Sequence, residues 1–357
     1  MNYARLCTFI SQYRFSVLAL AIALLCPAFL VGQGTTFRSF DAPDAGKQPH
    51  QGTVSLSINT FGSVTGFYID AASVDHGFFR DTGGRVVEFD PPGLVNTFAL
   101  AINGNMEIVG YGSRTVAGRT HQHGFRRSTF GQFAAVDVPG AADTMPYALN
   151  GSGQIAGTFS DDSDHLHGFL RNADGTYTVL DVPDLGTGAT LATTAVAMNA
   201  SGVIIGYYAD SAIATHGFVR DQFGNYTSFD PPDDANGAFP KGINAGGTIA
   251  GSYTDSNFGV HSFVRDAAGN ITTLDMPGAQ QTLADAINDQ GVIVGEVAQG
   301  DAFAAFRRDS LGNFGLLGIQ AENTGSNAFG IAGNRFTGSY IDLNGVSHGF
   351  TKHVETQ

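Results

Sequence analysis

The chain has 357 residues, of which 48 are glycine, 28 are phenylalanine and only 14% are charged. A hydrophobic content of 43% excludes a disordered polyelectrolyte, and the lack of a Gly-X-Y period excludes collagen. The net charge of −14 argues against a nucleic-acid partner, because binding to phosphates requires clustered lysine and arginine. Many glycines beside many phenylalanines favour short strands joined by tight turns.

Residues 1–34 are predicted to be a signal peptide. Arg5 and Arg14 are the only charged residues there, and a mostly apolar run, 15–31, follows them. This run has the length of the hydrophobic region of a signal peptide and is short for a membrane-spanning helix. The alternatives are an uncleaved N-terminal anchor and a lipoprotein attached through Cys26, which the two leucines before that cysteine argue against.

Both cysteines, Cys7 and Cys26, lie inside this leader. The mature chain is therefore expected to contain no thiol, which excludes disulfides and any site built on cysteine. We expect an exported protein, either secreted into the extracellular space or periplasmic. No second hydrophobic span follows, so no membrane span is expected after removal of the leader.

One pattern recurs from residue 35 to the end of the chain. Its clearest element is His-Gly-Phe, which becomes His-Ser-Phe once and Ala-Ala-Phe once, at 304–306. A second element is Ile-Asn or a variant, followed seven residues later in most copies by a glycine; a third is Phe-Asp-Pro-Pro or a variant. The histidines of the first element are His76, His123, His167, His216, His261 and His348. The aspartates of the third are Asp41, Asp90, Asp137, Asp181, Asp230 and Asp275.

Each unit of about 45 residues is predicted to form four short strands, which is typical of a β-propeller blade. The region from 35 onward begins with a lone fourth strand at 36–40 and ends with the first three strands of a unit, the last of which carries the final His-Gly-Phe at 348–350. The two ends are complementary. The sequence therefore predicts an all-β fold: one domain, 35–357, forming a seven-bladed β-propeller whose N-terminal strand closes the last blade in a 1+3 arrangement.

Loop lengths indicate which face carries function. The number of residues between the first and second strands, and between the third and fourth, is nearly the same in every unit. The connections between the second and third strands, and from the fourth strand to the next unit, vary in length. Up-and-down strands place these two variable kinds on the same face, where binding residues are usually carried. The longest variable loops are 42–52, 111–122 and 182–192. We therefore expect any site on this face, near blades one to four.

The recurring histidines resemble a metal or catalytic set, but one histidine per blade around a ring indicates hydrogen bonding within each blade. The recurring aspartates suggest turn capping, with an acidic rim for cations as the alternative. A non-repeated cluster is Asp161, Asp162, Asp164 and His165. It is a candidate Ca²⁺ site, although it lacks the glycine and terminal glutamate of an EF-hand, so a solvated acidic turn is the other interpretation. No other cofactor is expected.

Arg114, Arg119 and His121 lie on the inserted loop of blade two, where they would suit an anionic or sugar ligand; the alternative is an ordinary exposed loop. Lys241 breaks the small-residue pattern of an innermost strand and is a candidate for pointing into the central channel. No nucleophile elbow, zinc-protease helix or phosphate loop is present, and no catalytic residue is assigned.

The His-Gly-Phe and Ile-Asn-x-x-Gly-x-Ile-x-Gly units resemble the bacterial HAF-type extracellular repeats over 35–357, with glycine usually replacing the middle alanine. The resemblance implies export and a propeller, and no settled activity. We expect a monomeric, non-enzymatic binding module for a carbohydrate or an extracellular protein. The alternatives are a propeller enzyme, a polysaccharide hydrolase or lyase, and a structural component of the cell envelope or matrix. A cluster of non-repeated charged residues at the axis would favour the enzyme.

Overall fold

The computed structural model describes residues 35–183, 190–234, 237–300, 302–319 and 323–354. Contacts divide the chain into two units, Met1–Gly34 and Thr35–Gln357. The predicted signal peptide and most of the loop 182–192 lie outside the described residues. Within the described ranges, no helix is long and apolar enough to cross a membrane.

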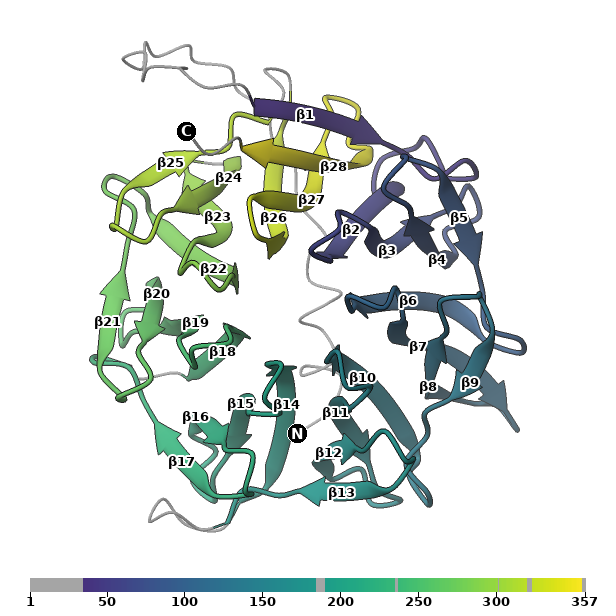
Figure 1. The fold of residues 1–357 in the computed structure, drawn as a ribbon, viewed down its shortest axis with the longest axis vertical. Helices are drawn as coiled ribbons and strands as arrows, with labels where there is room; N and C mark the ends of the chain where they lie inside the picture. Colours follow the sequence, from purple (N-terminus) through teal and green to yellow (C-terminus); the bar gives the residue numbers. More distant parts are fainter. Residues whose placement is uncertain (1–34, 184–189, 235–236, 301, 320–322, 355–357) are drawn as a thin grey trace. The chain divides into compact units, whose positions relative to one another are not determined.

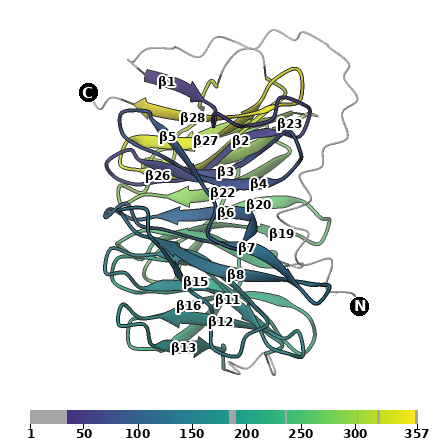
Figure 2. The same cartoon turned by 90° about the vertical axis from the view of Figure 1, so that its right-hand side faces the viewer.

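The described residues form 28 strands, which surround a central axis in antiparallel groups of four (Figure 1). Three of the groups are joined into one sheet by single parallel contacts. Each sheet runs outward from the axis, and Figure 2 shows the ring from its side. The strands form seven such groups, which is consistent with the expected seven blades. We call the groups blades one to seven in chain order, and the strands of each blade a to d from the axis outward.

The a strands line the centre of the ring in Figure 1: β2 (Gly52–Ile58), β6 (Val95–Ile102), β10 (Asp143–Leu149), β14 (Ala192–Met198), β18 (Ala238–Ile243), β22 (Gln281–Ile287) and β26 (Gly325–Ala332). The b strands are β3 (Val64–Ile69), β7 (Ile108–Val116), β11 (Ile155–Ser160), β15 (Ile204–Ala209), β19 (Ile249–Thr254), β23 (Ile293–Gln299) and β27 (Arg335–Ile341).

The c strands are β4 (Asp75–Arg80), β8 (Arg119–Arg127), β12 (Leu166–Arg171), β16 (Thr215–Arg220), β20 (Val260–Arg265), β24 (Ala302–Arg308) and β28 (Ser347–Val354). The outermost d strands are β5 (Val86–Phe89), β9 (Phe133–Ala135), β13 (Tyr177–Leu180), β17 (Tyr226–Phe229), β21 (Ile271–Leu274), β25 (Phe314–Leu316) and, for the last blade, β1 (Thr35–Phe40).

The N-terminal strand β1 completes the last blade, as the complementary chain ends predict. It pairs antiparallel with β28 along its whole length, from Thr35 opposite Val354 to Phe40 opposite Gly349. The ring of Phe37 lies 5.7 Å from that of Phe350. The closing strand therefore contributes both a hydrogen-bonded ladder and aromatic packing, and leaves no unpaired edge on β28.

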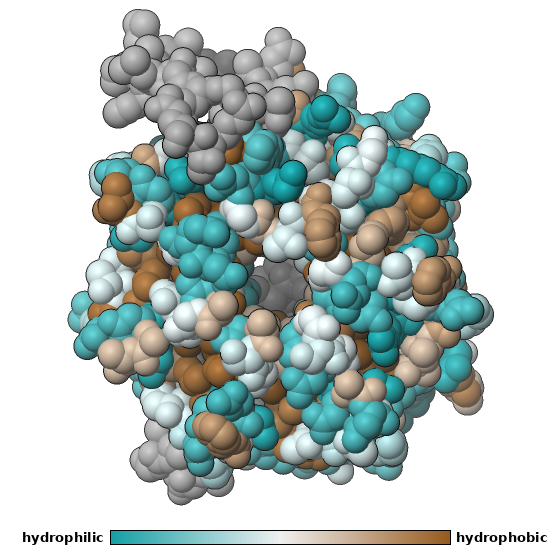
Figure 3. Space-filling view, in the orientation of Figure 1, coloured by the Kyte–Doolittle hydropathy of each residue, from teal (hydrophilic) through white to brown (hydrophobic). Residues whose placement is uncertain are grey.

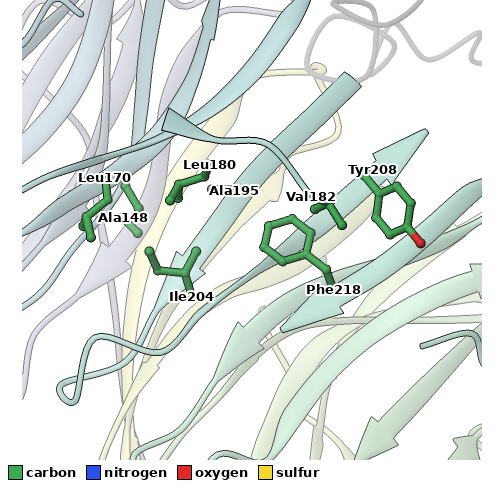
Figure 4. Packing of buried hydrophobic residues seen from close by; sticks show 9 residues of the cluster. Ala148, Leu170, Leu180, Val182, Ala195, Ile204, Tyr208 and Phe218 are labelled. Atoms are coloured by element: carbon green, nitrogen blue, oxygen red, sulfur yellow. The ribbon is translucent and has the colours of Figure 1, made fainter. Parts of the chain in front are cut away.

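The hydrophobic core lies between neighbouring blades. In Figure 4, Leu170 and Leu180 of blade three lie beside Ile204 and Phe218 of blade four, all of them at most 7% exposed. Similar clusters of buried residues recur around the ring. Each blade is thus stabilised by burying its faces against the two blades beside it.

Every a strand carries a β-bulge opposite a glycine of its b strand. In blade four the pairing passes from Ala195 to Ala197, which leaves Val196 unpaired. A Cβ atom on Gly206 would lie inside the carbonyl oxygen of Thr194, so only glycine fits there. The equivalent glycines are Gly66, Gly110, Gly157, Gly251, Gly295 and Gly338, each with the same close approach. The extra residues at the bulges are Leu56, Leu100, Tyr147, Val196, Lys241, Asp285 and Phe329.

Substitution of one bulge glycine should destabilise the protein strongly. Gly206→Ala forces the Thr194 carbonyl away and should lower the free energy of unfolding by about 3 kcal/mol, the upper part of the range for overpacking. Gly151→Ala is the matched control, because its Cβ would meet nothing within 4 Å. Chemical denaturation measures both, and equal stabilities would show that the bulge does not require glycine.

Deletion of residues 35–42 should lower the melting temperature by about 10 °C or more, because it removes β1 and the burial of Phe37 and Phe40. Differential scanning calorimetry measures the shift. Arg38→Ala, an exposed change on the same strand, should leave the melting temperature nearly unchanged. An unchanged melting curve after the deletion would contradict closure of the ring by β1.

Candidate functional site

The recurring histidines are held by the recurring aspartates. In six blades the imidazole Nδ1 donates to the carboxylate that lies 14 residues later, or to Asp41 in the last blade, at 2.7–3.1 Å. The pairs are His76–Asp90, His123–Asp137, His167–Asp181, His216–Asp230, His261–Asp275 and His348–Asp41. These carboxylates therefore join strand c to the end of strand d, a contact that the expected turn capping does not describe.

A second aspartate holds the other ring nitrogen in five of these blades. Its carboxylate lies 3.3–3.8 Å from Nε2. It also closes the b–c turn: Asp255 Oδ1 accepts from the backbone nitrogens of Asn257 and Gly259. The five are Asp70, Asp161, Asp210, Asp255 and Asp342. The histidine is thus clamped between two carboxylates, which supports a structural role.

In three of these blades the clamp raises the pKa of the histidine, and it lowers that of the aspartate in the b–c turn. Burial alone would lower the pKa of His76, His216 and His261, but the flanking carboxylates outweigh it and raise that pKa. Backbone hydrogen bonds, chiefly from Gly259, lower the pKa of Asp255, and its histidine adds to the effect. The ion pair is consequently favoured at mildly acidic pH.

Five of the candidate residues of blades two and three meet in one open pocket, and they are Arg114, Arg119, His121, Asp162 and Asp164. Its volume is about 310 Å³. Arg114, Val116, Arg119, His121 and His123 form one side. Ala141, Ala142, Asp162 and Asp164 of blade three form the rest. We call this the ribbon pocket. Two guanidinium groups and a histidine thus face two carboxylates across a hollow between neighbouring blades.

The arginines lie on strands rather than on the expected loop. Strands β7 and β8 continue past the usual length and turn at 117–118, forming a two-stranded ribbon that projects in Figure 2. Arg114 pairs with His121, and Val116 with Arg119, so alternation places these four side chains on one face of the ribbon. That face is the wall of the pocket. In the described part of the chain, neither guanidinium has an ion-pair partner.

The acidic cluster of blade three is divided by the structure. Asp161 belongs to the histidine clamp and also lies 3.3 Å from His165 Nδ1, whereas Asp162 and Asp164 line the ribbon pocket. Over the described ranges, no group of three or more His, Cys, Asp or Glu residues is arranged to hold a metal ion. The candidate Ca²⁺ ligands therefore do not converge, because Asp161 is engaged by the turn and by two histidines.

A second cluster of charged side chains lies on the a and b strands of blades five to seven. Lys241 and Asp285 are the bulged residues of neighbouring a strands, β18 and β22. Lys241 is exposed although its strand, β18, is one of those that line the centre of the ring in Figure 1. Glu296 on β23 and Asn327 on β26 are buried, at 5% and 6% exposure. We call these four residues the axial cluster.

Two carboxyl groups of the axial cluster are buried, and their pKa values are raised. Burial raises the pKa of both Asp285 and Glu296, and the charge of Asp285 raises that of Glu296 further. Lys241 opposes both shifts, and the neighbouring Asn327 side chain opposes that of Asp285. Asp285 Oδ2 and both polar atoms of the Asn327 side chain are buried without a hydrogen-bond partner among the described residues. Each such group costs about 1–3 kcal/mol when it is left unsatisfied.

Lys241 is the one member of the axial cluster that was predicted from the sequence. Asp285, Glu296 and Asn327 were not predicted. The repeat could have identified two of them, because the positions equivalent to Asp285 and Glu296 in the other blades carry no acidic residue. The second aspartate of each clamp was also missed, although it stands six residues before the histidine in five blades.

The comparisons with known proteins support the fold. No protein-family model and no curated protein matches the chain. Among solved structures, a catalytically inactive virginiamycin B lyase from Staphylococcus aureus with quinupristin is 14% identical, with a TM-score of 0.57, covering 90% of this chain and 100% of that one. The β-propeller domain of the Trilobed protease from Pyrococcus furiosus is 7% identical, with a TM-score of 0.55, covering 88% and 93%. A lectin from Burkholderia pseudomallei is 12% identical, with a TM-score of 0.51, covering 84% and 95%. The chain is an all-β propeller.

The clamps predict that thermal stability depends on pH. The raised histidine pKa contributes stability that is complete below about pH 6.5 and is lost as the pH rises through the folded-state value. The lowered aspartate pKa contributes stability that is present above about pH 3.9 and is lost as the pH falls. We therefore expect the highest melting temperature between these limits.

Replacement of one clamp histidine isolates this effect. His216→Asn should reduce the fall in melting temperature between pH 6 and pH 9, because one of the groups that lose a proton in this range is removed. His50→Asn is the control: His50 is exposed, and its left-handed backbone, with a φ of 67°, suits asparagine. A pH profile that is identical in both variants would contradict the clamp.

Proposed function

We propose that the protein is an exported, monomeric binding module of the HAF-type repeat family, built as a closed seven-bladed propeller and without catalytic activity. Its ligand is a carbohydrate or an extracellular protein, and it binds at the ribbon pocket. The carrying observation is the convergence of Arg114, Arg119 and His121 with Asp162 and Asp164 in one open hollow. None of these five residues belongs to the repeat.

The chemistry of the ribbon pocket supports a ligand that carries acidic and hydroxyl groups. Guanidinium groups bind carboxylates in a bidentate manner, and the opposing carboxylates accept hydrogen bonds from hydroxyls. A sugar acid presents both kinds of group. The likeness in fold to a lectin from Burkholderia pseudomallei supports carbohydrate as the ligand class.

Binding to an array of bacterial and plant polysaccharides tests this proposal. We expect affinity for uronate-containing glycans, and Arg119→Ala should weaken it about tenfold, the effect of one lost charge-assisted hydrogen bond. Arg85→Ala is the matched control, because Arg85 is an exposed arginine on a c–d turn away from the pocket. Equal binding by both variants would contradict the assignment.

The axial cluster supports a second candidate, an enzyme acting on a polysaccharide as a hydrolase or lyase. Burial raises the pKa of Glu296 and so favours the protonated carboxyl that a general acid requires, while Asp285 is the neighbouring carboxylate. The observation in its favour is that these charges have no counterpart in the repeat. Release of soluble products from any polymer in the array, abolished by Glu296→Gln, would replace the first proposal by this one.

A further inference from the structure

The axial cluster is not required by the fold, and the chain itself supplies the comparison. The bulge positions equivalent to Lys241 and Asp285 carry apolar or aromatic residues in the other five blades: Leu56, Leu100, Tyr147, Val196 and Phe329. The position of Asn327 is occupied elsewhere by Val54, Phe98, Met145, Thr194, Phe239 and Leu283. The same backbone therefore forms without these polar groups, and folding does not explain their presence.

The cluster also has unused hydrogen-bonding capacity. Asp285 Oδ2 and the Oδ1 and Nδ2 atoms of Asn327 are buried without partners in the described part of the chain. Asn327 itself is 94% buried, and neighbouring Lys241 is exposed on the innermost strand. Buried polar groups are nearly always paired in native proteins, so such a set indicates a missing occupant. Figure 3 shows the gap between the inner strands at the centre of this face.

The mixture of groups selects the chemistry of the occupant. Lys241 would repel a cation, and the Asp285 carboxylate would repel an anion. The ammonium and the carboxamide donate hydrogen bonds, whereas the carboxylate and the carboxamide oxygen accept them. A neutral ligand with adjacent hydroxyls both donates and accepts and meets no like charge. An uncharged sugar has this chemistry.

We propose that the axial cluster is a binding site for a neutral, polyhydroxylated ligand, an uncharged saccharide, at the centre of the ring. Asp285 and Asn327 accept from and donate to its hydroxyls, and Lys241 donates to a further oxygen. This site is separate from the ribbon pocket and does not rest on it. The axial cluster binds this ligand whether or not a reaction follows. The module then carries two sites, the ribbon pocket for an acidic ligand and the axial cluster for a neutral one.

Isothermal titration calorimetry on the exported protein tests the site, with cellohexaose, xylohexaose, maltohexaose and N-acetylchitohexaose as neutral probes and trigalacturonate as the anionic one. The variants use residues found at the same positions of sister blades: Lys241→Leu, Asp285→Val and Asn327→Val. Each should weaken binding of a neutral probe about tenfold or more. Leu100→Val, a change at the bulge of a blade without the cluster, should leave binding intact.

Thermal unfolding of the same variants separates binding from stability. Since Asp285→Val and Asn327→Val each remove buried polar atoms that lack a partner, the melting temperature of these two variants should stay the same or rise. A marked fall with Asp285→Val and Asn327→Val would show that the cluster is structural and would overturn the proposal. Failure of the unmodified protein to bind any neutral probe, or binding that all three variants retain, would overturn it equally.

Discussion

The close approach of a carbonyl oxygen on each inner strand to a glycine on the next strand is the constraint on which the structure depends. The bulge that creates it occurs in all seven a strands, and a Cβ atom at the facing glycine has no room. The bulge sets the register of every blade and leaves one residue of each inner strand outside the ladder. That residue need not pair with strand b, so it is free to vary.

Repeated and unrepeated residues have different roles in the rest of the molecule. The repeated ones hold the ring: glycines at the bulges, histidines clamped between carboxylates, and aliphatic and aromatic side chains between blades. The unrepeated ones gather in two places, the ribbon pocket and the axial cluster. Residues at positions that do not hold the ring together can change without loss of the fold. Such changes explain physically how one scaffold acquires a binding site.

Sequence reasoning predicted the four-stranded unit, the closing strand and most residues of the ribbon pocket, because periodicity and turn residues act locally. It placed Arg114 and Arg119 on a loop, because length alone does not distinguish a loop from a longer hairpin. It missed Asp285, Glu296 and Asn327, since their proximity is set by the packing of neighbouring blades around the axis. A comparison of equivalent positions across the repeat would have identified them as exceptions.

A high-resolution X-ray structure of the protein tests the central claim most directly. The account predicts a bulge in every inner strand, with Lys241 and Asp285 at the central hollow and an ordered ligand or water on Asp285 Oδ2 and the Asn327 amide. Regular inner strands without bulges, or an axial cluster closed by direct hydrogen bonds among its own side chains, would contradict it.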